Sequence, residues 1–328
     1  MRVTLSEDPL DFVRRDWTET VRADASGTFF HMPAYLKLYW EEFGQDAGLV
    51  LAFGEEGDAT IGACAFERIG QELRFLGGTE VTDYMGPVAP DASREEFASE
   101  MVASLASRDD WTSADLRNVP EDSAWLPLLA RAAAAQGLWH QVEEQDECPF
   151  LNLPATWDDY LAGLTPKLRH EVKRKARRLA SEGGAPRLVF ATADTLAEDL
   201  NLFIALHRSS EGPKGRFMQP GMEIFFRRLG EEFIEQRIFR LAFVEVGGKK
   251  VAGAVGFRSG DTFCLYNSAF DHRHRELSPG MVLVGELIRA CIEEGLSGYD
   301  MLKGGLAYKY RFGARPRKLF RLEISKRH

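Results

Sequence analysis

The sequence predicts an α/β (α+β) protein of two tandem domains, each with a mixed, mostly antiparallel sheet flanked by helices. Three observations support this class. The chain has 328 residues, of which 45% are hydrophobic, and this is enough to build two cores. A pattern of three strands occurs twice, at residues 49–77 and 239–267. The segments before and after each copy also follow the same order.

The repeated pattern is visible in "LVLAFGEEGDATIGACAFERIGQELRFLG" and "FRLAFVEVGGKKVAGAVGFRSGDTFCLYN". Each copy predicts a strand with Leu-Ala-Phe, a turn containing glycine, a strand with Gly-Ala-x-x-Phe, a polar turn and a third apolar strand. The spacing between the copies far exceeds a solenoid repeat, so two copies of one domain fit better than an array.

Helical patterns complete each half. The order predicted for both is helix, helix, three-stranded meander, helix, strand, helix, strand. The division falls in "CPFLNLPATWDDY", where Pro149 and Pro154 bracket a short strand and Thr156 begins a helix. We therefore expect an N-terminal domain at 1–150 and a C-terminal domain at 151–328.

Composition excludes several classes of protein. The net charge of -9 argues against a chain that coats nucleic acid or anionic lipid through its overall field. Cys64, Cys148, Cys264 and Cys291 lie far apart with no C-x-x-C pair, which indicates reduced core thiols and gives no reason to expect a metal site. The N-terminus has no signal-peptide pattern, and no apolar run approaches the roughly 20 residues of a membrane span. We expect a cytoplasmic protein without membrane insertion.

The stretch "HRHRELSPGMVLVGELIRACIEEG" places basic residues before a helix start. Ser278 is expected as the N-cap, Pro279 as the first helical residue and Gly280 as a site of close backbone approach. Arg273 and Arg275 beside free helix N–H groups suit a bound anion, although an ordinary solvated turn is the alternative.

The matching helix of the first half is expected to start at Asp91 or Ser93, with Glu95 and Glu96 in its first turn. Carboxylates at this position repel an anion. An anion site is therefore expected in the second half only.

Four segments carry a family resemblance: "CPFLNLPATWDDYLAGLTPKLRHEVKRKARRL", "SAFDHRHRELSPGMVLVGELI", "YDMLKGGLAYKYRFG" and "LRFLGGTEVTDYMGPV". Together they resemble the GNAT acyltransferase fold in its duplicated, FemABX-like form, and within that group the CelD-like acetyltransferases. The resemblance implies two tandem GNAT-like domains and acetyl-CoA or another acyl-CoA as co-substrate. It implies a degenerate, acceptor-side first domain and a donor-binding second domain.

In a GNAT fold the pyrophosphate of the donor rests on the loop after the third meander strand. The resemblance therefore implies donor-binding roles for Tyr266, Arg273, Arg275, Ser278, Gly280 and Met281. The Ser-Pro-Gly helix start departs from the Gly-rich loop of ordinary GNAT enzymes, which leaves acyl-CoA less certain as the donor.

Acyl transfer needs a base, oxyanion donors and a proton for the departing thiolate. Backbone N–H groups at residues 266–269 are candidates for the oxyanion donors. Tyr308 and Lys309 follow a predicted strand end, and with the resemblance they are catalytic candidates, although packing is the alternative. Asp83 in "TDYMG" is the third candidate, expected to orient the acceptor across a cleft shared with Lys309; a turn former is the alternative. His207 is more typical of a helix C-terminal cation or a core partner than of a base.

The helix expected in "TPKLRHEVKRKARRLASEGG" has one apolar stripe and many basic residues. A solvated face explains them most simply. An anionic substrate or, by likeness to Fem transferases, an aminoacyl-tRNA are the sharper alternatives.

These patterns predict an acyltransferase that moves an acetyl or longer acyl group to an amine or hydroxyl of a small-molecule or saccharide acceptor. A Fem-like transferase that uses aminoacyl-tRNA is the second prediction. A non-catalytic double-GNAT binding module is the third.

Overall fold

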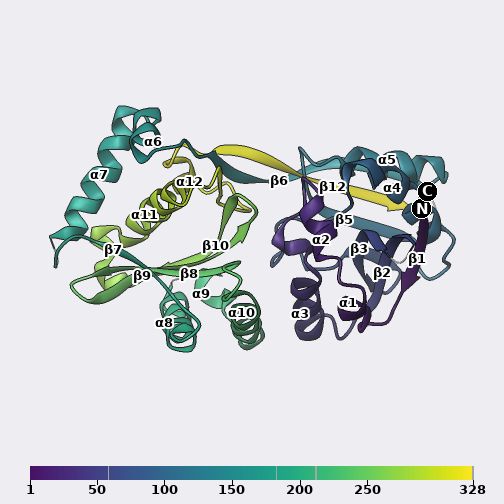
Figure 1. Cartoon of the computed structure of the whole chain (residues 1–328), viewed down its shortest axis with the longest axis horizontal. Coiled ribbons are helices and arrows are strands. Elements are labelled where there is room, and N and C mark those ends of the chain that lie inside the picture. Colours follow the sequence, from purple (N-terminus) through teal and green to yellow (C-terminus); the bar gives the residue numbers. More distant parts are fainter. Residues whose placement is uncertain (58, 182, 211–212, 327–328) are drawn as a thin grey trace. The chain divides into compact units, whose positions relative to one another are not determined.

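The computed structural model describes residues 1–57, 59–181, 183–210 and 213–326, which form two units (Figure 1). Unit 1 comprises Met1–Glu147 and Arg317–His328, and unit 2 comprises Cys148–Pro316. In both, a mixed sheet lies between layers of helices, so the predicted α/β class is confirmed. Within the described residues, no helix has both the length and the apolar content needed to span a bilayer.

The sheet of unit 1 has the order β1-β2-β3-β4-β5-β12. All neighbours are antiparallel except the parallel pair β4 and β5. The strands are β1 (Arg2–Ser6), β2 (Gly48–Glu56), β3 (Ala59–Ile69), β4 (Glu72–Phe75), β5 (Ser113–Pro120) and β12 (Arg315–Ser325).

Alternation along these strands gives the sheet two different faces. Leu73 and Phe75 of β4 point into one hydrophobic core, and Ala114 and Leu116 of β5 join them there. Successive side chains of a strand point to opposite faces, so Arg74 between the two β4 residues projects from the other face.

Helices cover both faces of unit 1. The core just described packs against α4 (Arg94–Ala106) and α5 (Trp125–Ala135). The other face carries α1 (Asp11–Arg14), α2 (Thr18–Ala23), the 3-10 helix η1 (Phe29–His31) and α3 (Pro33–Phe43) (Figure 1). A second 3-10 helix, η2 (Asp91–Ser93), leads into α4.

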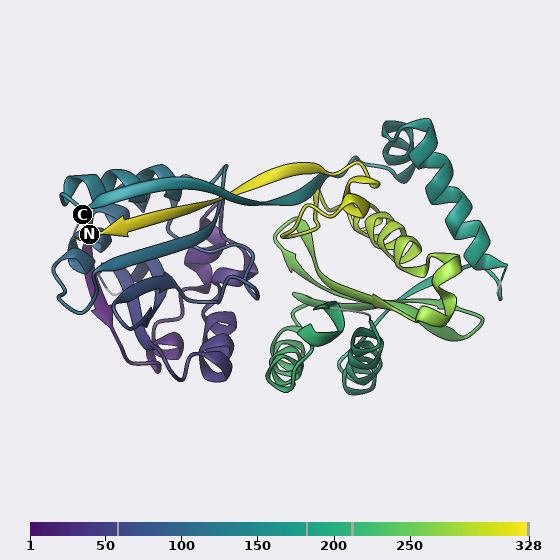
Figure 2. The ribbon, with the colours of Figure 1, turned by 180° about the vertical axis from the view of Figure 1, so that it is seen from behind.

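The order of elements along each half is the predicted one, but the last strand of each half pairs with a strand of the other half. β12, at the C-terminal end of the chain, pairs with β5 in unit 1 (Figure 2). β6 (Trp139–Asn152) begins in unit 1, and its last residues pair with β11 in unit 2. Apolar alternation fixes which face a strand buries but not which edge it joins, so the sequence pattern contained no signal for this exchange.

The sheet of unit 2 has the order β6-β11-β10-β9-β8-β7. Its only parallel neighbours among the described strands are β10 and β11. The strands are β7 (Arg187–Phe190), β8 (Phe239–Val246), β9 (Lys249–Ser259), β10 (Thr262–Phe270) and β11 (Gly298–Asp300). Both predicted meanders are therefore present, as β2-β3-β4 and β8-β9-β10.

Helix α11 (Pro279–Glu293) covers one face of the unit 2 sheet, and α8 (Leu196–Arg208) with α10 (Pro220–Phe233) covers the other. The remaining helices are α6 (Trp157–Gly163), α7 (Pro166–Ala180), α9 (Pro213–Phe217), η3 (His272–Leu277) and α12 (Ala307–Tyr310). All four cysteines are buried free thiols.

Replacement of a β12 core residue tests the strand exchange. Leu322 is fully buried in the unit 1 core although it lies near the end of the chain. We expect Leu322→Ala to lower the free energy of unfolding of unit 1 by about 2–5 kcal/mol, because it leaves a cavity. Hydrogen exchange followed by mass spectrometry should show faster exchange in β5 and α5, with β8 and β9 unchanged. Faster exchange confined to unit 2 would contradict the pairing.

The pH dependence of stability tests the buried His31. Burial lowers the pKa of this ring from 6.5 to about 4, and nearby Asp24 opposes the shift only in part. The unfolded chain therefore binds a proton at a higher pH than the folded chain. We expect the free energy of unfolding to have its full value above pH 6.5 and to fall by up to about 3 kcal/mol as the pH drops toward 4.

Urea denaturation at several pH values measures this dependence. His31→Gln should flatten the slope between pH 6.5 and 4, whereas His170→Gln, at an exposed position, should leave it unchanged. Equal slopes in the wild type and His31→Gln would show that another group is responsible.

Candidate active site

The candidate site of unit 2 begins where two parallel strands stop pairing. β10 and β11 pair over three positions only, from Thr262 opposite Gly298 to Cys264 opposite Asp300. β11 ends there, while β10 continues to Phe270. From residue 265 onward, β10 therefore has a strand partner, β9, on one side only within the described structure. This open edge exposes backbone groups to a ligand.

A bulge lies at the start of the open edge. The register of β10 against β9 shifts between Leu265 and Asn267, which places the extra residue at Tyr266. A bulge bends the strand and redirects its backbone groups. The half-buried Tyr266 ring packs against Phe226 and Phe257, with centroids 5.6 and 5.4 Å away.

His207 lies next to this bulge. Its Nε2 is 3.0 Å from Oδ1 of Asn267, and the ring is fully buried at the end of α8. The N–H of Ser268 donates to the same Oδ1 at 2.9 Å, which occupies one of the N–H groups offered as oxyanion donors. Sequence reasoning favoured a cation or core role for His207, since periodicity alone did not reveal Asn267 opposite it.

The basic loop after β10 forms η3, and its residues Arg273 and Arg275 differ in their contacts. The carboxylate of Asp271 accepts from the Arg273 backbone N–H and from its guanidinium, at 2.7 to 3.1 Å. These hydrogen bonds lower the pKa of Asp271 to about 2. Arg275 is exposed, and its side chain makes no hydrogen bond or ion pair with a described residue. Arg275 is therefore the better placed of the two for an external anion.

The start of α11 differs in one respect from the prediction. Ser278 precedes the helix and Pro279 is its first residue, as expected, but the Ser278 side chain makes no capping hydrogen bond. Its φ of 55° is left-handed, because η3 must turn sharply into α11. Ser278 is therefore the N-cap by position, as predicted, without a hydrogen bond from its side chain. A Cβ at Gly280 would lie 3.3 Å from the Phe270 ring, so the close approach there is to Phe270.

A pocket of about 380 Å³ adjoins α11, between this helix, α6 and α7. Met281, Gly285 and Val172 contribute to its apolar floor, and Lys173 and Arg177 of α7 contribute positive charge. The predicted donor residue Met281 thus lies on a pocket wall.

Lys309 is held inside the loop that follows β11. Its Nζ donates to the carbonyls of Met301, Leu302 and Lys303 at 2.7, 2.9 and 2.9 Å. Three carbonyls match the three N–H groups of an ammonium, and the residue is 5% exposed. Leu302 has a left-handed φ of 54°, and Asp300 Oδ1 accepts its N–H at 2.7 Å. These contacts support a structural role for Lys309, while a catalytic role stays a prediction.

Tyr308 packs at the edge of the unit 2 core, and burial raises the pKa of its hydroxyl. It therefore stays protonated near neutral pH, in the form that a proton donor needs. Its catalytic role also stays a prediction.

Asp83 belongs to unit 1, in the loop after β4. It is 9% exposed, and its neighbour Thr82 donates to the Gly77 carbonyl at 2.7 Å. Asn118 Nδ2 donates to the Thr82 carbonyl at 2.7 Å, so this loop is tied to β5. Because Asp83 and Lys309 belong to different units, the cleft expected between them stays a prediction.

The first turn of α4 carries Glu95 and Glu96, as predicted for the half without an anion site. The N-terminal ammonium of Met1 pairs with Glu96. Arg94 pairs with the buried Asp24 at 2.7 Å. Arg94 and Glu96, at the start of α4, are therefore paired within this chain. The side chain of Arg275, before α11, pairs with no described residue.

Comparison with known proteins agrees with this geometry. Residues 166–310 match the family model described as an acetyltransferase (GNAT) domain. The crystal structure of FemX superposes with a TM-score of 0.66 at 11% identity, covering 98% of this chain and 97% of that one. A conserved Bacteroides thetaiotaomicron protein of unknown function gives a TM-score of 0.64 at 12% identity, covering 99% and 100%. A comparison with curated proteins gave no match.

A third structure, named as the C-terminal domain of a lysylphosphatidylglycerol synthetase from Agrobacterium fabrum, has a TM-score of 0.62 at 12% identity and covers 97% of this chain and 92% of that one. The fold is thus that of an acyltransferase with two GNAT-like units. Residues 166–310 thus match the GNAT superfamily, and the two-unit fold supports the resemblance to double-GNAT, FemABX-like proteins.

Replacement of Lys309 separates a structural role from a catalytic one. Lys309→Met would leave three carbonyls without their ammonium, and we expect it to lower the free energy of unfolding by about 2–4 kcal/mol. Amide exchange in residues 301–306 should become faster. The control is Lys249→Met at an exposed position, which should change neither. Unchanged stability and exchange in Lys309→Met would contradict the structural role.

Proposed function

We propose that this protein transfers an acyl group from acyl-CoA to an amine or hydroxyl of a small-molecule or saccharide acceptor. The observation that carries the proposal is the open edge of β10, which is followed by η3, with the exposed Arg275, and by the start of α11. Backbone groups at one end and a free guanidinium at the other suit a ligand with an amide-rich arm and a diphosphate. The GNAT match of residues 166–310 includes this region.

The proposed chemistry forms one bond and breaks one. The acceptor nitrogen or oxygen attacks the thioester carbon, the C–S bond breaks, and the proton of the acceptor ends on the departing thiolate. Backbone N–H groups near the Tyr266 bulge are placed to donate to the developing oxyanion. The protonated Tyr308 hydroxyl is the candidate donor to the thiolate, and Lys309 supports this region by fixing the loop before it.

In this proposal Asp83 belongs to the acceptor side, in unit 1. Its burial and the loop that holds it suit a group that orients an acceptor. The use of acyl-CoA and the free thiols fit a cytoplasmic protein.

Transfer from aminoacyl-tRNA is the second candidate, and α7 is the observation that favours it. Five of its basic residues are exposed: Lys167, Lys173, Arg174, Arg177 and Arg178. Arg169, expected to face outward with them, instead is half-buried and donates to the carbonyls of Ala162 and Leu164 at 3.1 Å. A row of exposed cations can bind a nucleic-acid backbone. The likeness to FemX in fold agrees with this candidate but does not select it.

Charge reversal at Arg275 tests the donor site. We expect Arg275→Glu to weaken acetyl-CoA binding at least about fivefold, because repulsion replaces a charge-assisted phosphate contact. Isothermal calorimetry measures the affinity, and Arg187→Glu, at an exposed position of β7, is the matched control. Equal affinity in both variants would place the donor elsewhere.

Thermal unfolding with each donor separates the two candidates. A ligand that binds only the native state raises the melting temperature. We expect acetyl-CoA to do so and deacylated tRNA not to do so. If tRNA raises the melting temperature and acetyl-CoA does not, the second candidate is selected. In that case tRNA binding should be lost at high salt and when the basic residues of α7 are replaced by neutral ones.

A further inference from the structure

A pocket of about 470 Å³ lies in unit 1, beside the point where its own parallel strands stop pairing. The residues that define its chemistry are Tyr39, Phe43, Glu67, Arg74, Asp115 and Arg117. They come from α3, β3, β4 and β5. None of them is among the candidate residues of the acyl-donor site.

The charged residues of this pocket form a row across the sheet. Glu67 of β3 lies opposite Arg74 of β4, Arg74 lies opposite Asp115 of β5, and Asp115 lies opposite Glu323 of β12. Residues directly opposite each other project from the same face. The row therefore occupies the face opposite the core under α4 and α5.

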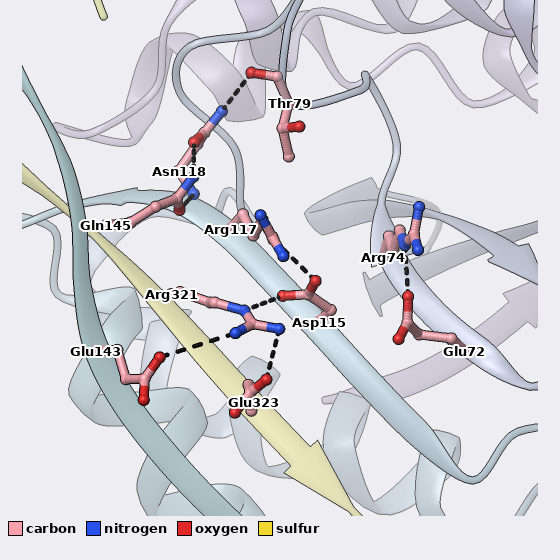
Figure 3. Close-up of polar contacts among 10 residues, drawn as sticks. All are labelled: Glu72, Arg74, Thr79, Asp115, Arg117, Asn118, Glu143, Gln145, Arg321 and Glu323. Atoms are coloured by element: carbon pink, nitrogen blue, oxygen red, sulfur yellow. Dashed lines mark hydrogen bonds and ion pairs between the residues drawn. The ribbon is translucent and has the colours of Figure 1, made fainter. Parts of the chain in front are cut away.

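Most charges in the row are paired within the protein (Figure 3). Asp115 accepts from Arg117 at 2.8 Å and from Arg321 at 2.6 Å. These bonds lower the pKa of Asp115 although burial alone would raise it. Arg321 also pairs with Glu323 at 2.5 Å, and Arg74 pairs with Glu72 at 2.6 Å.

Glu67 is the exception. Its side chain is only 7% exposed, and it has no hydrogen bond or ion pair with a described residue, since Arg74 is turned toward Glu72. Burial raises the pKa of Glu67, and the charge of Arg74 offsets this only in part. A carboxyl group that lines a pocket and has no partner among the described residues can accept hydrogen bonds from a ligand.

The other residues of the pocket indicate which kind of ligand it can bind. The rings of Tyr39 and Phe43 pack at a tilt of 44°, with centroids 5.2 Å apart, and supply aromatic surface. Gly78, with φ of 66°, lets the loop after β4 approach Tyr39, because a Cβ there would collide with the tyrosine hydroxyl. Aromatic rings and a buried carboxylate both attract a cation, and both suit an ammonium on an organic body.

We propose that this pocket binds an organic amine, with Glu67 accepting hydrogen bonds from its ammonium and the rings of Tyr39 and Phe43 contacting its carbon skeleton. The assignment of this amine as the acyl acceptor rests on the proposed function. The binding of an amine in this pocket does not depend on that function.

Three probes with the same ring and different end groups test the inference: 2-phenylethylamine, 2-phenylethanol and 3-phenylpropionate. Calorimetry and saturation-transfer NMR on the full chain, without acyl-CoA, measure their binding. We expect the amine to bind most tightly. Glu67→Gln keeps the side-chain shape and should weaken amine binding at least about tenfold. Glu100→Gln, at an exposed position of α4 on the other side of the sheet, should leave it unchanged.

Several outcomes would overturn the inference. They are no amine binding at millimolar concentration, alcohol or carboxylate binding as tight as that of the amine, and undiminished amine binding in Glu67→Gln. Because no acyl donor is present, these results do not depend on the donor site. If the protein binds the amine but does not bind acetyl-CoA, the proposed function is rejected, and the inference that the pocket binds an amine still holds.

Discussion

Both candidate sites depend on one constraint, the short parallel pairing inside each sheet. β10 and β11 pair over three positions, and so do β4 and β5. Where this pairing stops, backbone and side chains that a continuous sheet would cover become available to a ligand. In unit 2 the result is an open strand edge with a bulge, and in unit 1 it is a pocket beside Arg74 and Asp115.

The groups that hold these open ends are buried and polar. Lys309 binds three carbonyls beyond β11, whereas in unit 1 Asn118, with a left-handed φ of 59°, donates to the loop carbonyl of Thr82. Each anchor fixes a loop that hydrophobic packing alone would leave undefined. The two units thus reach similar openings through different side chains, which agrees with different ligands in the two units.

The comparison of the two units also explains why the donor site is proposed in unit 2. Around α4 the nearby charges are paired internally, through Arg94 with Asp24 and Met1 with Glu96. Before α11, the carboxylate of Asp271 accepts a hydrogen bond from Arg273, and the side chain of Arg275 is exposed. In the unit 1 pocket, the carboxyl of Glu67 has no ion pair with a described residue, and a carboxylate attracts a cation.

The sequence by itself determined the two meanders, the sheet class and the helix starts at Thr156 and Pro279, because periodicity and capping residues are local signals. Only the tertiary structure decided that β12 joins β5, that Lys309 binds three carbonyls, and that Glu67 lines a pocket without a partner among the described residues. Strand edges and ion pairs are chosen among residues distant in sequence, such as Asp115 and Arg321, and a local pattern carries no information about that choice.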